Sequence, residues 1–220
     1  MRQVFIILGP PAAGKTSYRK AIARWLNIQK RYHVAWYVRT NGKHKFDIQE
    51  RRGSFIKGVT GPFLNFVKKH SNGASCIIDG FPRNLGQAKA ILKHFKAEEL
   101  VLIHINVEVE DLKNWSYQRQ LRRTLRRHEK PDQKLYLAKI NRYLRYELSA
   151  ICHLEANLNP SQIITINSNQ AISESYRQLR LALGLPEEIT GRDVSEETDT
   201  NLTIKPTETF TTEALLPVGP

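Results

Sequence analysis

The feature that most constrains this chain is a glycine-containing loop that follows a short apolar run near the N-terminus. Residues Gln3–Leu8 are rich in β-branched and other large apolar side chains, which is typical of a buried strand. The next eight residues, Gly9-Pro10-Pro11-Ala12-Ala13-Gly14-Lys15-Thr16, satisfy the pattern G-x-x-x-x-G-K-[ST]. Small residues let backbone N–H groups turn inward around phosphate oxygens, and a helix that begins at Lys15 adds its positive N-terminal end. This strand, loop and helix predict a nucleoside triphosphate site.

Two side chains of the loop have defined tasks. Lys15 can reach the β- and γ-phosphates, and the Thr16 hydroxyl can help to hold Mg²⁺. The alternative is a strand-to-helix turn that binds nothing, but the complete pattern in its expected context argues against it. The loop does not identify the second substrate. The predicted ATP-binding residues here are Gly9, Pro10, Ala12, Ala13, Gly14, Lys15, Thr16 and Ser17.

Strand-like and helix-like segments alternate along the rest of the chain. Short β-branched and apolar runs predict strands at Gln3–Leu8, Val34–Val38, Ser75–Asp79, Leu100–Asn106 and Gln162–Asn167. Helices are expected between and after them, at Thr16–Leu26, Pro62–Lys69, Leu85–Phe95, Asp111–Arg127, Lys134–Leu154 and Ile172–Leu183. Alternation of this kind favours parallel strands joined by right-handed helical crossovers. The predicted fold class is α/β, a three-layer P-loop fold with a five-stranded parallel sheet and helices on both faces.

Charge divides the chain into a basic body and an acidic tail. The chain carries 34 basic and 21 acidic residues, a formal net charge of +13. Residues 186–220 hold eight of the acidic residues and two of the basic ones, which leaves 32 basic and 13 acidic residues, or +19, for residues 1–185. The tail is rich in Thr, Glu and Pro, and we expect it to be disordered. A body this basic attracts polyanions, whether nucleotides, nucleic acid or an anionic membrane.

Cysteine usage and hydropathy argue against several classes of protein. Cys76 and Cys152 are the only cysteines and have no partner at metal spacing, which disfavours a disulfide framework and a structural zinc site and favours a reducing cytoplasm. The apolar run at residues 4–8 is too short for a signal segment or a membrane span. The expected protein is a cytoplasmic monomer without a membrane partner.

A second polar cluster follows the third predicted strand. Ligands bind at the carboxyl ends of parallel strands, and Asp79 lies at such an end, where a P-loop enzyme orders its Mg²⁺ shell. Arg83 suits a phosphate because its guanidinium donates two parallel hydrogen bonds. Gln87 falls four residues later, on the same helix face, and its amide can pair with a base edge. The alternative for Asp79–Arg83 alone is a proline turn after a strand.

In these two motifs the chain resembles adenylate kinase and the related nucleoside monophosphate kinases. The resemblance rests on Gly9–Lys15 and on Asp79–Ala88, which reads D-G-F-P-R-x-x-x-Q-A. It implies ATP on the loop and a nucleoside monophosphate, AMP by default, as the acceptor. It also implies Mg²⁺ as cofactor, held by Thr16 and Asp79. The acceptor-binding residues that it implies are Thr40, Gly80, Arg83 and Gln87.

A run of arginines matches a further part of the family pattern. Family members carry two arginines four residues apart before a mobile lid, which Arg119 and Arg123 match, and R-x-x-x-Y on the next helix, which Arg142 and Tyr146 match. The resemblance implies that Arg119 binds ATP and that a short lid lies at about 120–133. An acceptor-binding insert is expected at about 40–70. Phosphoryl transfer needs positive groups around the transferring oxygens, so the catalytic set is Lys15, Arg83, Arg123 and Arg142.

Two departures from the family pattern leave other functions open. Thr16-Ser17 stands where the family has Gly-Thr, and Thr40–Lys45 lacks the arginine of the family's T-G-x-x-x-R. Lys45, Arg51 or Arg52 would then have to neutralise the acceptor phosphate, Lys without the fork of an arginine. One alternative is therefore another small-molecule P-loop kinase. The other is a non-catalytic P-loop protein that binds ATP and uses its arginine strip on nucleic acid, a partner that the sequence allows but does not favour.

Overall fold

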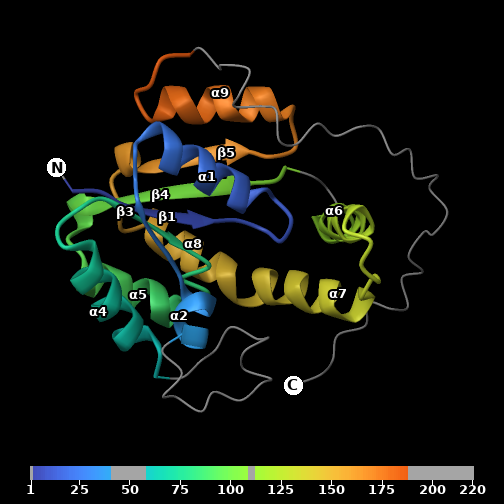
Figure 1. Ribbon diagram of the computed structural model, residues 1–220, viewed down its shortest axis with the longest axis horizontal. Coiled ribbons are helices and arrows are strands. Elements are labelled where there is room, and N and C mark those ends of the chain that lie inside the picture. Colours follow the sequence, from blue (N-terminus) through green and yellow to red (C-terminus); the bar gives the residue numbers. More distant parts are fainter. Residues whose placement is uncertain (1, 41–57, 109–111, 188–220) are drawn as a thin grey trace. The chain divides into compact units, whose positions relative to one another are not determined.

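The computed structural model describes residues 2–40, 58–108 and 112–187 (Figure 1). Within these ranges five parallel strands form one sheet in the order β2-β3-β1-β4-β5. This confirms the predicted α/β class and its five-stranded parallel sheet. The strands are β1 Val4–Leu8, β2 Lys30–His33, β3 Cys76–Asp79, β4 Leu100–Asn106 and β5 Ile163–Asn167.

Helices cover both faces of the sheet, as Figure 1 shows. One face packs against α1 (Lys15–Trp25) and α9 (Ile172–Ala182). The other face packs against four helices of the described ranges. These are α2 (Val34–Thr40), α4 (Thr60–Ser71), α5 (Leu85–His94) and α8 (Leu148–Glu155).

The central strand explains why two cores form. All five residues of β1 are buried, and successive side chains point to opposite faces of the sheet. Val4, Ile6 and Leu8 enter the core beneath α4, α5 and α8, while Phe5 and Ile7 enter the core beneath α1 and α9. A strand buried on both faces needs a continuous apolar run, which is the pattern that made β1 predictable.

The predicted strand at Val34–Val38 was wrong, because these residues form helix α2 and the strand lies earlier, at Lys30–His33. Val34, Tyr37 and Val38 are the buried residues of α2, and their i, i+3, i+4 spacing is that of a helix face. Among the strands in the described part of the chain, β2 lies at the edge of the sheet and pairs with β3 alone. An edge strand does not need an apolar run, so the β-branched content of Val34–Val38 was misleading.

The predicted helix Lys134–Leu154 is continuous but not uniform. Helix α7 (Gln133–Arg142) passes through one π-helical turn at Tyr143–Glu147 before α8 begins. A π turn inserts an extra residue and often marks a functional site, because it redirects the side chains that follow. No helix in the described ranges is both long and apolar enough to cross a lipid bilayer.

Several predictions concern residues outside the described ranges. Residues 41–57 of the predicted acceptor-binding insert, including Lys45, Arg51 and Arg52, lie outside them. The same is true of Asp111, where a helix was expected to begin, and of residues 188–220 in the predicted tail. Helix α6 begins at Leu112 and ends at Arg126.

Candidate active site

The parallel register brings the carboxyl ends of three strands into one row. Ile7 of β1 pairs with Asp79 of β3, and Asp79 in turn pairs with His33 of β2. The chain leaves β1 through the glycine-containing loop, one residue beyond Leu8. The loop and the two polar residues therefore share one edge of the sheet, which is where ligands bind in open α/β folds.

Glycine is required where the loop leaves β1. Gly9 has φ +150, and a Cβ atom there would lie 2.4 Å from the carbonyl oxygen of Ile105 on β4. At the other end of the loop Gly14 adopts a left-handed conformation with φ +80 and caps α1, so the helix begins at Lys15. The loop thus opens the N-terminus of α1 toward the same edge of the sheet, which creates a place for an anion.

Neighbouring elements hold the outer side of the loop. Ser116 Oγ of α6 donates to the Pro11 carbonyl at 2.8 Å, and Arg119 Nε donates to the Ala12 carbonyl at 3.1 Å. From the end of β5, Ser168 Oγ donates to the Ala13 carbonyl at 3.1 Å. Three successive carbonyls are fixed in this way, so the loop is shaped before any ligand arrives. Arg119, which the sequence assigned to ATP, lies against the loop itself.

Lys15 folds back over the loop. Its Nζ donates to the carbonyls of Gly9, at 2.7 Å, and Pro10, at 2.6 Å. Burial lowers the pKa of Lys15 to about 8; Arg83 and Arg123 also lower it, whereas Glu147 and Asp79 raise it. Because Arg83 and Arg123 both lower this pKa, the positive charges of the three side chains lie close enough to repel one another.

The turn after β3 orients Arg83. Its Nε donates to the Gly80 carbonyl at 2.7 Å, and its backbone N–H donates to Gln87 Oε1 at 2.7 Å. Gln87 is itself placed by the cap of α5, because its backbone N–H donates to Asn84 Oδ1 at 2.9 Å. Just before the turn, Asp79 is ion-paired with Arg19 of α1, with 2.9 Å between Oδ2 and Nη1.

Lys15 and Arg83 both line one cavity of about 470 Å³. Among the described residues, its lining includes the carboxylates of Glu129 and Glu147 together with six cationic side chains: Lys15, Arg83, Arg123, Arg127, Lys139 and Arg142. Burial lowers the pKa of Lys139 and of Arg142, and neighbouring arginines lower both further. A cavity in which cations crowd each other in this way favours a polyanionic ligand.

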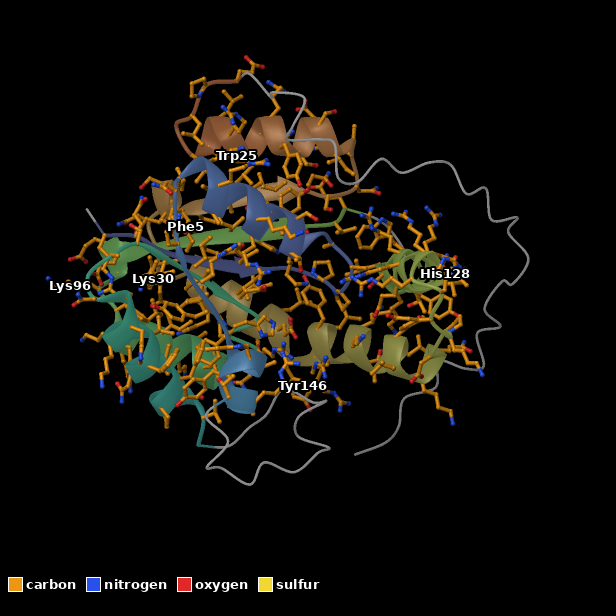
Figure 2. The ribbon with its side chains drawn as sticks, in the orientation of Figure 1. Phe5, Trp25, Lys30, Lys96, His128 and Tyr146 are labelled. Carbon is orange, nitrogen blue, oxygen red and sulfur yellow. The ribbon has the colours of Figure 1, made fainter. Side chains whose placement is uncertain are left out.

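A helical hairpin forms one wall of the cavity. Helices α6 and α7 are joined by residues 127–132, and Figure 2 shows His128 at that turn. The hydroxyls of Tyr136 and Thr124 are hydrogen-bonded across the hairpin, and Tyr136 packs edge-on against Tyr117. Of the predicted lid at about 120–133, residues 120–126 are the last turns of α6.

The structure brings together all four of the predicted catalytic residues. Lys15, Arg83, Arg123 and Arg142 line the cavity, as do Gly80 and the loop residue Ala12. Thr16 is exposed beside Lys15 at the start of α1.

Two predicted acceptor residues lie elsewhere. The Thr40 hydroxyl donates to the Trp36 carbonyl at 3.0 Å, at the end of α2, and Thr40 is not among the residues that line the cavity. Gln87 is buried and directs its side-chain oxygen at the backbone of Arg83. Gln87 therefore contacts the arginine that lines the cavity, and its assignment to a base remains a prediction.

Other cavity residues were missed by sequence reasoning. The residue pattern alone does not identify four residues that line the cavity: His33, Gln120, Lys139 and Glu147. The signal for Gln120 was available, since it adjoins Arg119 and lies four residues after Ser116 on the helix that contacts the loop. His33 was hidden by the misplaced second strand, and Glu147 is presented by a π turn that helical spacing does not predict.

The depressed pKa of Lys15 predicts a pH-dependent affinity for ATP. Bound phosphates favour the charged lysine and raise its pKa, so binding above pH 8 must take up a proton. Below that pH the lysine is already charged and contributes no dependence. We expect ATP affinity to fall by as much as about tenfold per pH unit above pH 8.

Calorimetry in buffers of different ionisation enthalpy measures this proton uptake directly. The Lys15→Met variant should lose the uptake, which separates Lys15 from other titrating groups. A wild-type affinity that stays constant from about pH 7 to about pH 9.5 would contradict the expectation.

Comparison with known proteins gives similarity in sequence and in fold. No family model matches the chain. The adenylate kinase of Rickettsia bellii is 32% identical over 117 residues, 49% of this chain and 53% of that protein. The adenylate kinase of Helicobacter pylori strain Shi470 is 29% identical over 138 residues, 56% of this chain and 69% of that protein. The match thus spans about half the length of the first relative and about two thirds of the second.

Solved structures share the fold at low sequence identity. A gluconokinase from Sinorhizobium meliloti matches with a TM-score of 0.51 and 12% identity, over 84% of this chain and 94% of that one. A shikimate kinase from Bacteroides thetaiotaomicron matches with a TM-score of 0.50 and 19% identity, over 84% and 99%. The chain therefore has the fold of the P-loop kinases and is adenylate kinase-like in sequence.

Proposed function

We propose that this protein transfers the γ-phosphoryl group of ATP to a nucleoside monophosphate, giving ADP and a nucleoside diphosphate, with AMP as the default acceptor. The observation that carries the proposal is the cavity that Lys15 of the loop and Arg83 of the β3 turn both line. Two anion-binding groups that follow adjacent strands and face one cavity allow two phosphate-bearing ligands to lie side by side. The sequence similarity to adenylate kinases supports the same reaction.

Each cation has a separate task in this reaction. Lys15 and the loop amides hold the β- and γ-phosphates, and the fork of Arg83 holds the acceptor phosphate. An acceptor phosphate oxygen attacks the γ-phosphorus while the bond from that phosphorus to the bridging β-oxygen breaks. Arg123 and Arg142 stabilise the negative charge on the equatorial oxygens, and positioning with electrostatic stabilisation supplies most of the catalysis.

Thr16 and Asp79 fit the requirements of a Mg²⁺ ion that accompanies ATP. Mg²⁺ prefers oxygen ligands and is usually held by one or two protein groups together with substrate phosphates. Asp79 uses Oδ2 for Arg19, which leaves Oδ1 for the metal shell. When bound, the ion would neutralise the charge of the β- and γ-phosphates, and Arg19 would keep the Asp79 carboxylate oriented.

A second candidate is phosphorylation of a small molecule that is not a nucleotide. The observation in its favour is the pair of carboxylates, Glu129 and Glu147, that line the cavity with the cations. A carboxylate repels an acceptor phosphate but accepts hydrogen bonds from a hydroxyl group. Glu147 is the more informative of the two carboxylates, because it is also the one that most raises the pKa of Lys15.

An acceptor panel distinguishes the two candidates. ADP formation from ATP is measured with AMP, CMP, UMP and GMP, and in parallel with gluconate and shikimate. We expect acceptor-dependent ADP formation with AMP and none with the two hydroxy acids, and the Lys15→Ala variant gives the background. ADP formation that depends only on a hydroxy acid would overturn the nucleotide assignment. ATP binding without acceptor-dependent turnover, together with salt-dependent binding of RNA, would favour the non-catalytic alternative.

A further inference from the structure

His33 lies in the wall of the cavity and has no task in the steps above. It is the last residue of β2, it pairs with Asp79 across the sheet, and it lines the cavity together with Gly80 and Arg83. These neighbours belong to the acceptor side of the proposed reaction. The sequence also left that side short of one phosphate-binding group, since Thr40–Lys45 has no arginine at the family position.

One hydrogen bond fixes the tautomer of the imidazole. The backbone N–H of Ala35 donates to His33 Nδ1 at 3.1 Å, so His33 caps the first turn of α2. Nδ1 accepts only when it carries no proton, so the proton of the neutral ring is on Nε2. Nε2 makes no hydrogen bond with the protein in the ranges that the structure describes. His33 therefore has one nitrogen committed to the fold and one N–H donor that is available.

The surroundings of Gly80 place the Nε2 donor beside Arg83. A Cβ atom on Gly80 would lie 3.1 Å from His33 Nε2 and 3.2 Å from Arg83 Nη2. The two nitrogens therefore lie beside Gly80 and close to each other, which the missing side chain of residue 80 permits, and the positive φ of Gly80 suits glycine as well. An imidazole N–H and a guanidinium this close together can both donate to one tetrahedral oxyanion.

The surroundings of His33 favour the neutral form of the ring. Burial lowers the pKa of His33, Asp79 raises it, and Arg83, Arg19 and Arg39 lower it further. A neutral imidazole can stand beside Arg83 without adding another repelling charge. It still offers an N–H group, which is the one polar feature that a phosphate oxygen requires.

We infer that His33 Nε2–H donates a hydrogen bond to the phosphate of the acceptor, next to Arg83, and selects acceptors that carry a phosphate monoester. The inference rests on the proposed function and specifies which chain atoms recognise the acceptor. The ligand chemistry is a phosphate dianion, which a nucleoside monophosphate or free inorganic phosphate can supply.

Two substitutions at position 33 test the Nε2–H donor separately from the Nδ1 atom that caps α2. His33→Asn keeps a side-chain oxygen that caps α2, as asparagine does well, but does not reach the position of Nε2. His33→Gln carries an amide nitrogen that does reach it. A hydrogen bond to a charged group is worth roughly 10- to 100-fold in affinity. We therefore expect His33→Asn to raise the KM for AMP by that factor with little change in the KM for ATP, and His33→Gln to restore most of it. His94→Asn on α5 is the matched control, because His94 is not among the cavity residues.

Binding measurements separate this inference from the proposed function. AMP, adenosine and inorganic phosphate are titrated calorimetrically into wild type and His33→Asn. A loss of affinity for AMP and inorganic phosphate, but not for adenosine, supports the role of His33 even if wild type transfers no phosphoryl group. Equal AMP affinity in wild type and His33→Asn would overturn it, as would an absence of AMP binding to wild type.

A spectroscopic measurement on wild type does not depend on how the variants fold. In ¹⁵N-histidine spectra the Nε2 resonance of His33 should shift on addition of AMP and stay in place on addition of adenosine. A resonance that does not move with AMP, or a neutral ring protonated at Nδ1, would contradict the inference.

Discussion

Replacing Lys15 by alanine should reduce kcat for phosphoryl transfer by about 10²- to 10³-fold, the range found when one preorganised donor to a developing oxyanion is removed. Lys15 is the cation of the loop, and its Nζ lies 2.7 Å and 2.6 Å from the Gly9 and Pro10 carbonyls. It is held over the loop before ligand binds, so the reaction does not have to organise it.

The control for this variant is Lys20→Ala, an exposed lysine on the same helix. The measurement is steady-state ADP formation with saturating ATP and AMP, with the melting temperature of each variant recorded. We expect Lys20→Ala to keep wild-type turnover. A Lys15→Ala enzyme that is folded and turns over within a few-fold of wild type would remove the loop lysine from the mechanism.

Replacing Arg83 by alanine should have an effect of similar or larger size, about 10³-fold or more in kcat/KM for the acceptor. The guanidinium is preorganised by its bond to the Gly80 carbonyl and by the contact between its backbone and Gln87. Its loss removes the charge that holds the acceptor and leaves the ATP loop intact. ATP affinity, measured by calorimetry, should therefore stay within a few-fold of wild type.

The Arg83→Lys variant tests whether the fork matters as well as the charge. Lysine supplies a point charge but not two parallel donors, so an intermediate loss is expected. Lys89→Ala, an exposed position on α5, is the control for changes in net charge. If Arg83→Ala weakens ATP and acceptor binding equally, Arg83 supports the loop rather than the acceptor, and the division of the cavity into two sites is wrong.

The parts of the fold that the sequence predicts are those in which one physical requirement dominates. Strand β1 is buried on both faces and leads into a loop whose glycines are sterically required, so both are visible in the residue pattern. Strand β2 is an edge strand with Lys30 and Arg31 exposed, and nothing in its composition sets it apart from a loop. The apolar run that follows it became helical because Val34, Tyr37 and Val38 bury one face together.

The candidate site divides in the same way. Lys15, Arg83, Arg123 and Arg142 occur in local patterns and could be identified from their spacing, and the structure places all four around one cavity. Other elements place the remaining residues: the sheet register places His33, the α6–α7 hairpin places Lys139, and the π turn places Glu147. No spacing rule connects them, because their proximity is a property of the tertiary structure.

The side chain of Gln87 illustrates a different limit of sequence reasoning. Its amide has both a donor and an acceptor, which suits a base edge. In the structure the acceptor half holds the backbone N–H of Arg83 at 2.7 Å, in the first turn of α5. The residue type indicated that the side chain would make hydrogen bonds, and only the fold shows that one of its partners is the arginine beside it.

The most direct test of the central claim is a ³¹P NMR time course of ATP, AMP and Mg²⁺ with wild-type protein. If Lys15 of the loop and Arg83 serve one cavity, the resonances of ATP and AMP should decline together while those of ADP grow. Inorganic phosphate should show no matching rise. An unchanged AMP resonance, with ATP either stable or converted to ADP and inorganic phosphate, would contradict transfer between two nucleotides.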